Sequence, residues 1–277
     1  TTIINGNCGL SLAPVRGEHR EALLRYLSPI VGELPEGRDF PTMEAYLRQA
    51  QEAQPPLNTL MLAGMGSIRA CAAGFSNAPL TGAEYAKVHA LLEESLAGGA
   101  VGVSLGLGYA PECFYTTEEL IRALQPIAGQ DVPVTVHMRQ EGGGVCQSVE
   151  EMLAVARALG APMHISHLKA MGRENWGTKI PQALALMESA RREGLDVSCD
   201  VYPYTAGSTQ LLHILPPEFL EGGMDAVAER LADPRQRELL ARRIESGEGF
   251  DDIARLAGWD GILLTSLHCP EDQIYLG

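Results

Sequence analysis

Three residues, Cys8, His137 and His167, could together bind a zinc ion. Each follows a short run of apolar or β-branched residues, and such runs predict strands. Thiolate and neutral imidazole are ligands that zinc prefers, and a set of three leaves the fourth position for water. Zinc lowers the pKa of bound water to about 7 and polarises a carbonyl group. The chemistry that these residues indicate is therefore hydrolysis, most simply of an amide.

The segment between the two histidines predicts how they are positioned. A strand ending at His137 is followed by a helical pattern and then by a second strand ending before His167. Ser148 and Glu151 are spaced as a capping box, and Gly160 is placed to end the helix. Two strands joined through one helix lie parallel, so both histidines are expected at the carboxyl edge of the sheet, where α/β proteins place their sites.

Side-chain alternation predicts which neighbours share a face with these histidines. Arg139 is expected on the face of His137, and Lys169 on the face of His167. His164 is an odd number of residues from His167, so we expect it to point toward the covering helices and to be structural.

Six core strands are predicted at residues 1–6, 58–63, 100–107, 132–137, 162–166 and 195–201, with a last candidate at 261–267. They alternate with helical patterns, as in a parallel α/β fold. No G-x-G-x-x-G or Walker loop follows any of them. We therefore expect a TIM-like (β/α)8 barrel that lacks its N- and C-terminal parts, with residues 1–277 as the central part of one domain. Residues 216–257 predict a charged helical excursion, broken at Asp233-Pro234.

Composition excludes several partners. The 277 residues carry a formal net charge of −14, which argues against nucleic acid and anionic membranes. No segment resembles a membrane span or a signal peptide, so a cytoplasmic protein is the default expectation. The six cysteines show no C-x-x-C pairing and are expected to be reduced thiols.

Hydrolysis also needs a carboxylate that takes a proton from water and delivers it to the leaving amine. Asp200, at the end of a predicted strand, and Glu141, four residues after His137, are the candidates. For Asp200 we favour the alternative, in which it supports a histidine or the loop backbone.

Four motifs resemble the N-acyl-D-amino-acid deacylase (D-aminoacylase) family of the amidohydrolase superfamily: NGNCGLSLAP at residues 5–14, VHMRQEG at 136–142, ISHLKAMG at 165–172 and DVYPYTAGST at 200–209. The resemblance covers nearly the whole chain. It implies a zinc-bearing TIM barrel with a small β domain and hydrolysis of N-acyl-D-amino acids to a carboxylic acid and a free D-amino acid. It also implies zinc ligands at Cys8, His137 and His167, and a substrate site that includes Tyr109, Lys169, Tyr202 and Ser208. Arg139 is added to that substrate site because we expect it on the same face as His137.

The chain also departs from the family pattern. The family's early His-x-His motif, its catalytic Asp in a Gly-Ser-Asp context and its C-terminal Arg have no counterpart, and its Gly-His-Gly reads Gly64-Met65-Gly66. We therefore expect the general base to lie outside these residues, which alone would have little activity. Two alternatives stay open. One is a cyclic amidase of the dihydroorotase or hydantoinase type, although none of the strands before His137 ends in the lysine that those enzymes carboxylate. The other is a non-catalytic metal-binding fragment.

Overall fold

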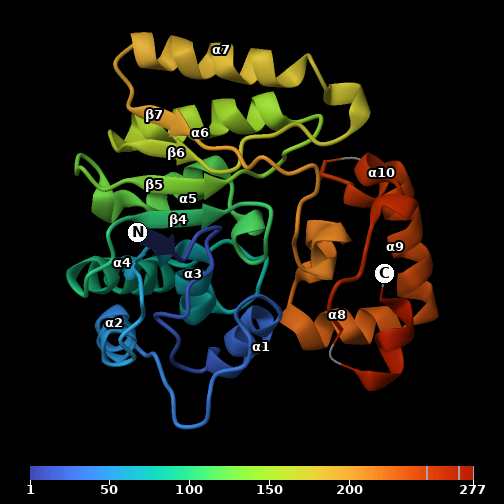
Figure 1. Ribbon diagram of the computed structural model, residues 1–277, viewed down its shortest axis with the longest axis horizontal. Helices are drawn as coiled ribbons and strands as arrows, with labels where there is room; N and C mark the ends of the chain where they lie inside the picture. The colour runs from blue at the N-terminus through green and yellow to red at the C-terminus, as the bar shows by residue number, and fades with distance from the viewer. Residues whose placement is uncertain (248, 268, 277) are drawn as a thin grey trace.

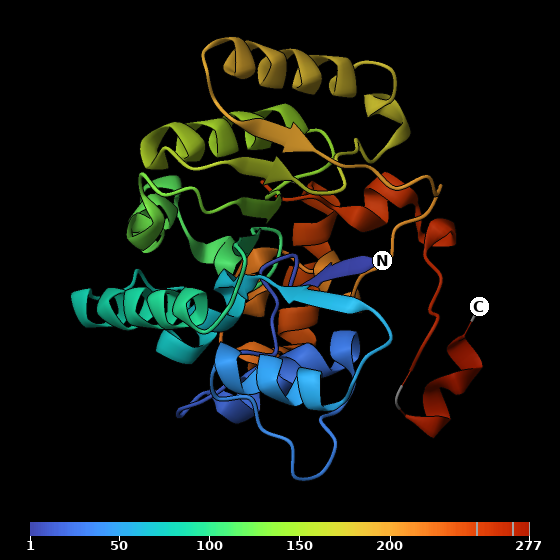
Figure 2. The same cartoon turned by 60° about the vertical axis from the view of Figure 1, so that its left-hand side comes forward.

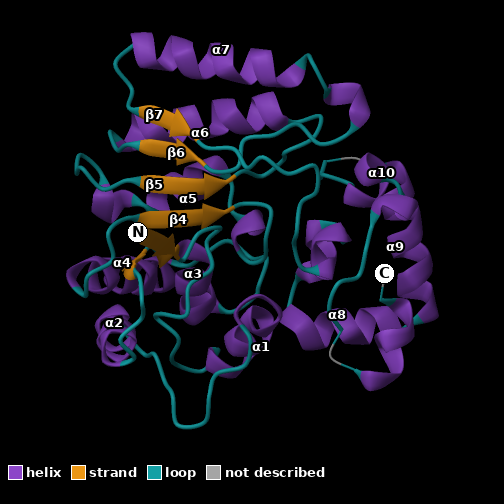
Figure 3. Ribbon diagram, in the orientation of Figure 1, coloured by secondary structure: helices purple, strands orange, loops and turns teal. Residues whose placement is uncertain are grey.

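The computed structural model describes residues 1–247, 249–267 and 269–276 (Figure 1). It contains parallel strands covered by helices (Figure 3). The strands are β1 (Thr2–Asn5), β2 (Asn58–Met61), β3 (Ala63–Gly64), β4 (Val103–Gly106), β5 (Val134–His137), β6 (Met163–Ile165) and β7 (Val197–Cys199). The helices are α1 (Arg20–Val31), α2 (Met43–Glu52), α3 (Met65–Ala73), α4 (Gly82–Ala97), α5 (Thr117–Ala123), α6 (Val145–Leu159), α7 (Lys179–Arg192), α8 (Gly223–Ala232), α9 (Pro234–Ser246) and α10 (Ile253–Ala257).

All strand pairs are parallel, and they form two groups that meet at Leu62. β1 pairs with β2, and β3 to β7 pair in sequence order. Leu62 separates β2 from β3, and its N–H donates to Asn5 O at 2.9 Å, while Ala63 N–H donates to Gly102 O at 2.9 Å. The run from β2 to β3 therefore faces β1 with its first half and β4 with its second half. Because β2 continues into β3 and every pair is parallel, all these strands run in the same sense around the sheet. Figure 2 shows β1 and β2 side by side.

The two faces of the β4–β7 sheet differ in polarity. Val103, Leu105, Val134, Val136, Met163, Ile165 and Val197 are almost fully buried in one apolar cluster with residues of α4, α6 and α7. Burying such a side chain contributes about 1.5 to 3 kcal/mol. The opposite face carries a row of aligned polar residues: Ser104, Thr135, His164 and Ser198. Helices α4, α6 and α7 thus cover the apolar face.

The expectation that His164 points toward the helices is therefore wrong. It lies in the polar row, where its ring nitrogens lie 2.9 Å from Ser198 Oγ and 2.9 Å from an Asp200 carboxylate oxygen. The parity argument fails because β6 ends at Ile165 and His167 adopts φ 42°, so alternation does not continue to His167.

Capping residues mark some helix ends of this chain but not the predicted start of α6. Thr116 and Glu119 form a capping box at the start of α5, and Gly160 ends α6 in the left-handed conformation at φ 62°. The capping box predicted at Ser148 and Glu151 is wrong, because α6 begins three residues earlier, at Val145. Ser148 lies inside the helix, where its Oγ accepts from Gln140 N–H at 3.0 Å.

Two further elements differ from expectation. Helix α3 was not predicted from the sequence, although it follows β3 directly and is buried along most of its length. Residues 261–267, predicted as a strand, form none in the structure: Gly261 ends a short 3-10 segment, and Leu263 is 67% exposed. A strand is stabilised by pairing with a neighbour, and no strand of the described chain lies beside this segment.

The helical excursion contains α8, α9 and α10, and it lies beyond the carboxyl ends of the strands (Figure 1). The break between α8 and α9 falls where it is predicted, with Asp233 as the cap and Pro234 as the first residue of α9. Phe219, Leu220 and Val227 pack with Leu23 and Leu27 of α1 in a second apolar cluster. In the part of the chain that the structure describes, no helix has the length and apolar character that crossing a membrane requires.

Candidate metal centre

Cys8, His137 and His167 come together at the carboxyl edge of the strands. Among the described residues they form a group whose potential ligand atoms all lie within 4.8 Å of one another. His137 Nδ1 lies 3.1 Å from His167 Nε2, and Cys8 Sγ lies 3.7 Å from the same nitrogen. With Zn–N bonds near 2.0 Å and Zn–S bonds near 2.3 Å, ligand atoms around one tetrahedral ion are roughly 3 to 4 Å apart. The spacing therefore suits a shared metal ion.

Two of these three residues have an unusual backbone conformation. Cys8 adopts φ 57° and His167 φ 42°, in the left-handed region that residues other than glycine rarely occupy. The Cys8 turn is held by Ser104, whose Oγ accepts from Gly9 N–H at 3.1 Å. Gly106 allows β4 to approach this turn, because a Cβ there would lie 2.0 Å from Cys8 O. Strain of this kind persists where surrounding structure enforces it, and functional sites are common among such places.

Burial prepares the donor atoms for a metal. Burial lowers the pKa of His137 to about 3, so its imidazole is neutral and its lone pair is free to bind a cation. Burial, with a further contribution from the charge of Glu141, raises the pKa of Cys8 to about 12. A buried thiol in this position needs a cation to become a thiolate, and a divalent metal supplies that charge. The residues present therefore fit a zinc ion.

Glu141 lies between the histidines and Lys169. It is 3% exposed, with Oε1 2.9 Å from His167 Nδ1 and Oε2 2.5 Å from Lys169 Nζ. Burial alone would raise the pKa of Glu141, but the neighbouring imidazoles and the Lys169 ammonium lower it to about 2. An ionised carboxylate at His167 Nδ1 favours the tautomer whose Nε2 lone pair faces Cys8 and His137. Glu141 is therefore placed to orient His167, one of the three candidate metal ligands.

The proposed substrate-site residues surround the centre to different degrees. Tyr109 packs against the His137 ring at 4.5 Å between centroids, and its hydroxyl lies 3.0 Å from Thr209 Oγ1. Lys169 Nζ lies 5.7 Å from the centre of the Tyr202 ring. Ser208 is exposed on the same loop as Thr209. Tyr109 thus borders the His137 ring, and its hydroxyl contacts the loop that follows β7.

Arg139 does not belong to this group. Its guanidinium donates to both carboxylate oxygens of Glu151 and to the carbonyls of Cys113 and Tyr115, at 2.8 to 3.2 Å. The alternation argument extended past the end of β5 at His137, where it no longer applies. We therefore remove Arg139 from the candidate substrate contacts.

Asp200 contacts the backbone of His167 and the ring of His164. Its carboxylate accepts from the backbone N–H of His167 and lies 2.9 Å from His164 Nε2. These contacts match the supporting role that we favoured, and they hold the strained backbone of His167 in place.

Sequence reasoning did not single out His213. Its ring stacks on Tyr109 at 4.7 Å and lies 5.6 Å from the His137 ring. Burial lowers its pKa, so it is a neutral imidazole. His213 lies in a short 3-10 segment, Leu211–Ile214, where no periodic pattern marks it.

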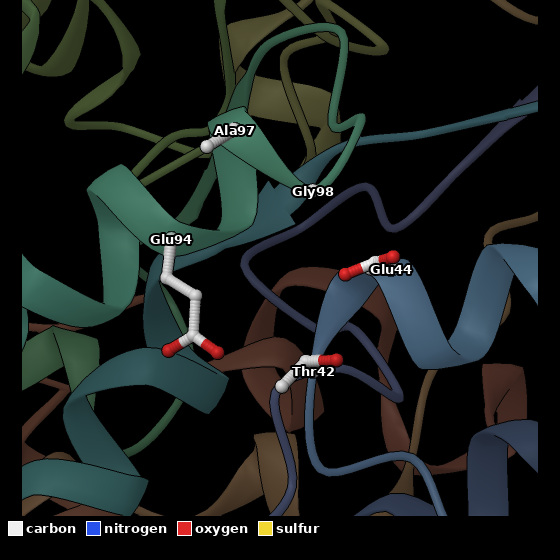
Figure 4. A pocket seen from close by; sticks show the side chains of 5 residues that line it. All are labelled: Thr42, Glu44, Glu94, Ala97 and Gly98. Atoms are coloured by element: carbon white, nitrogen blue, oxygen red, sulfur yellow. The ribbon is translucent and has the colours of Figure 1, made fainter.

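A separate hollow of about 190 Å³ lies between the start of α2 and the end of α4, lined by Thr42, Glu44, Glu94, Ala97 and Gly98 (Figure 4). Gly98 precedes β4, so this hollow is at the opposite end of the sheet from the metal centre. The Glu94 carboxylate already accepts hydrogen bonds from the Arg16 guanidinium, one of them at 2.9 Å. This hollow is therefore not a candidate for the chemistry described above.

No protein-family model matches the chain, but curated relatives and solved structures do. The chain is 36% identical over 213 residues to the D-aminoacylase of Alcaligenes xylosoxydans xylosoxydans, covering 76% of this chain and 42% of that protein. It is 32% identical over 277 residues to the N-acyl-D-glutamate deacylase of the same organism, covering 99% of this chain and 52% of that protein. The chain thus spans about half the length of the curated relatives it matches.

Solved structures agree with these relatives. The N-acyl-D-glutamate deacylase of Bordetella bronchiseptica, complexed with zinc and a phosphonate mimic of the tetrahedral intermediate, superimposes with a TM-score of 0.63 at 32% identity over 74% of this chain and 42% of that one. A D-aminoacylase described as having a binuclear metal centre superimposes with a TM-score of 0.66 at 30% identity over 87% of this chain and 52% of that one.

The parallel α/β fold, with potential metal ligands at its strand ends, and these matches define the chain as an amidohydrolase-type protein. Within that class the chain belongs to the D-aminoacylase family of N-acyl-D-amino-acid deacylases.

Proposed function

We propose that this chain is the central part of an incomplete (β/α)8 barrel whose whole protein hydrolyses the amide bond of N-acyl-D-amino acids in a zinc-dependent reaction. The observation that carries the proposal is the convergence of Cys8, His137 and His167 at one strand edge, in a chain related to deacylases along 99% of its length. We further propose a cytoplasmic location and small-molecule substrates.

Cys8, His137 and His167 would hold the metal. Zinc bound there would polarise the acyl carbonyl and lower the pKa of a water molecule, as amide hydrolysis at neutral pH requires. Glu141 keeps the His167 ring oriented, and Asp200 holds its backbone. Because both carboxylates already have these partners, the proposed general base lies outside these residues.

Lys169 would bind the substrate carboxylate. Its ammonium lies 2.5 Å from a Glu141 carboxylate oxygen and donates to the His167 carbonyl at 3.3 Å, and it has a third proton to donate. Tyr109, Tyr202 and Ser208 would contribute hydroxyl groups from other directions. Contacts from several fixed directions distinguish a D-substrate from its mirror image, because only one enantiomer can satisfy them together.

The cyclic amidase alternative has less support. Those enzymes use a carboxylated lysine, and Lys169 lies beyond β6, paired with Glu141, rather than on an earlier strand. Relatives of this chain are named as a D-aminoacylase and as deacylases of N-acyl-D-glutamate and N-acyl-D-aspartate. A non-catalytic metal-binding role would involve the same metal site. It differs from the main proposal in that the whole protein would not hydrolyse N-acyl-D-amino acids.

Replacing Cys8 with Ser tests the metal site. A hydroxyl is a poor zinc ligand at neutral pH, so the Cys8→Ser variant should lose most of the zinc that the parent chain binds. Cys199, which is exposed in β7, provides the matched control, and Cys199→Ser should keep the metal. Zinc content would be measured by atomic absorption on the purified proteins. Equal zinc content in Cys8→Ser and in the parent chain would remove Cys8 from the proposed ligand set.

A further inference from the structure

One carboxylate of the helical excursion accepts hydrogen bonds from the loop that follows β5. Asp251 lies between α9 and α10, 110 residues after Glu141 in the sequence. Its side chain accepts from the backbone N–H of Glu141, and its two oxygens lie 3.1 and 3.2 Å from the backbone nitrogen of Gly142. These two N–H groups belong to the loop that follows β5, just after His137. An ionised acceptor makes such hydrogen bonds stronger than a neutral one would.

The loops are shaped to receive this contact. A Cβ on Gly142 would lie 2.9 Å from Asp251 Oδ1 and 2.8 Å from Leu256 Cδ1. Leu256 belongs to α10, and it also fills the space beside Gly172, where a Cβ would lie 2.6 Å from its Cδ2. Gly142 follows β5 and Gly172 follows β6. The segment 251–257 therefore packs against the two loops that follow β5 and β6.

Glu141 is held on both sides of its backbone. Its N–H donates to Asp251, and its carbonyl accepts from Met171 N–H at 2.8 Å. With both groups fixed, the Glu141 carboxylate is directed at His167 Nδ1 and Lys169 Nζ. A displaced Glu141 backbone would move that carboxylate away from the histidine that it orients.

We propose that Asp251 is a positioning residue for the metal centre, which it serves by fixing the backbone of Glu141. This inference rests on the metal site of the proposed function and adds a role for the helical excursion. It assigns to Asp251 no contact with substrate.

The chain offers a matched control in the next residue. Asp252 is 3% exposed, and its carboxylate accepts from Arg255 N–H at 3.0 Å, which caps α10. Removing that cap should cost about 1 kcal/mol of helix stability. Asp252→Ala therefore loosens α10 itself, whereas Asp251→Ala removes the hydrogen bonds to the loop.

The first measurement is hydrogen exchange of individual amides in the metal-free 277-residue chain. In Asp251→Ala the amides of Glu141 and Gly142 lose their acceptor and should exchange faster than in the parent chain and in Asp252→Ala. Unchanged exchange at these two amides would overturn the proposal. Amide exchange does not depend on metal, so it tests the Asp251 hydrogen bonds even if the parent chain binds no zinc. Failure of the parent chain to bind zinc would refute the proposed function and not the Asp251 contact.

The second measurement is zinc affinity, by competition with a chromophoric chelator, together with the visible spectrum of bound Co²⁺. Loss of groups that orient metal ligands lowers affinity by 10- to 100-fold, and we expect Asp251→Ala to fall near the lower end, at roughly tenfold. Its Co²⁺ spectrum should change as well. Asp252→Ala should keep the parent affinity and spectrum. Equal losses in both variants, or faster exchange without any loss of affinity in Asp251→Ala, would show that the Asp251 hydrogen bonds do not position the centre.

Discussion

Glu112 is a buried carboxyl group whose ionisation should make folding depend on pH. It is 1% exposed and lies beneath the Cys8 turn, where it accepts from the backbone N–H groups of Gly106, at 3.0 Å, and Gly66. A Cβ on Gly9 would lie 1.7 Å from one of its oxygens, so the carboxyl group needs the space that this glycine leaves. Burial raises its pKa from 4.5 to about 8, because these two amides and the nearby Arg69 only partly replace water.

The raised pKa of Glu112 determines how the free energy of unfolding depends on pH. Between pH 4.5 and 8 the folded chain keeps a proton on Glu112 that the unfolded chain releases, so the free energy of unfolding falls as pH rises. The full contribution is present below pH 4.5 and is lost as pH passes about 8. Within this window the slope is about 1.4 kcal/mol per pH unit. Between pH 5.5 and 7.5, Glu112 should therefore lower stability by about 3 kcal/mol.

Glu112→Gln removes the titration and keeps an oxygen acceptor for the two amides. Urea unfolding of the parent chain and the variant at pH 5.5 and 7.5 gives the difference between their free energies of unfolding at each pH. That difference should shift by about 3 kcal/mol in favour of the variant at the higher pH.

Glu118→Gln is the control, because Glu118 is an exposed carboxylate on α5 and its loss changes the net charge equally. Its stability difference from the parent should be the same at both pH values. A Glu112→Gln difference that is also independent of pH would refute the reasoning, and would mean that Arg69 and the amides stabilise an ionised Glu112 fully.

Two further predictions concern the site itself. In the whole protein, Lys169→Met should lower kcat/KM more for an N-acetyl-D-amino acid than for the matching amide without a free carboxylate; equal losses would exclude Lys169 as the carboxylate contact. Gly106→Ala places a Cβ 2.0 Å from Cys8 O, so it should destabilise the chain by about 1 to 3 kcal/mol and weaken zinc binding. Gly82→Ala is the control, because its position at the start of α4 has open space, and it should change neither stability nor zinc binding. If both variants behaved alike in urea unfolding and zinc titration, the close approach of β4 to the Cys8 turn would be contradicted.

Much of the core could be predicted because its signals are local. Strands β1, β2, β4, β5, β6 and β7 each lie within a short apolar run of the sequence, and their parallel order follows from the helices between them. The three proposed zinc ligands were predicted for the same reason, because each stands just after such a run and parallel strands end at one edge.

Predictions that extended local rules past the ends of elements were wrong. Arg139 and His164 were assigned faces by alternation, but alternation holds only within a strand. The capping box at Ser148 was wrong because the preceding glycine loop allows α6 to begin earlier. The strand at 261–267 was wrong because a strand is stabilised by its neighbour rather than by its own sequence.

By itself, the sequence determined the parallel α/β class and the shared edge at which the three candidate ligands stand, since these depend on residue type and on spacing along the chain. Only the tertiary structure decided which residues from distant segments hydrogen-bond to one another. Glu141 and Asp251 are 110 residues apart, and nothing in either segment indicates that one backbone N–H donates to the other side chain. The same holds for the left-handed backbone at Cys8 and His167, which the surrounding contacts enforce. Such pairings arise when distant segments pack together, so they carry no local pattern.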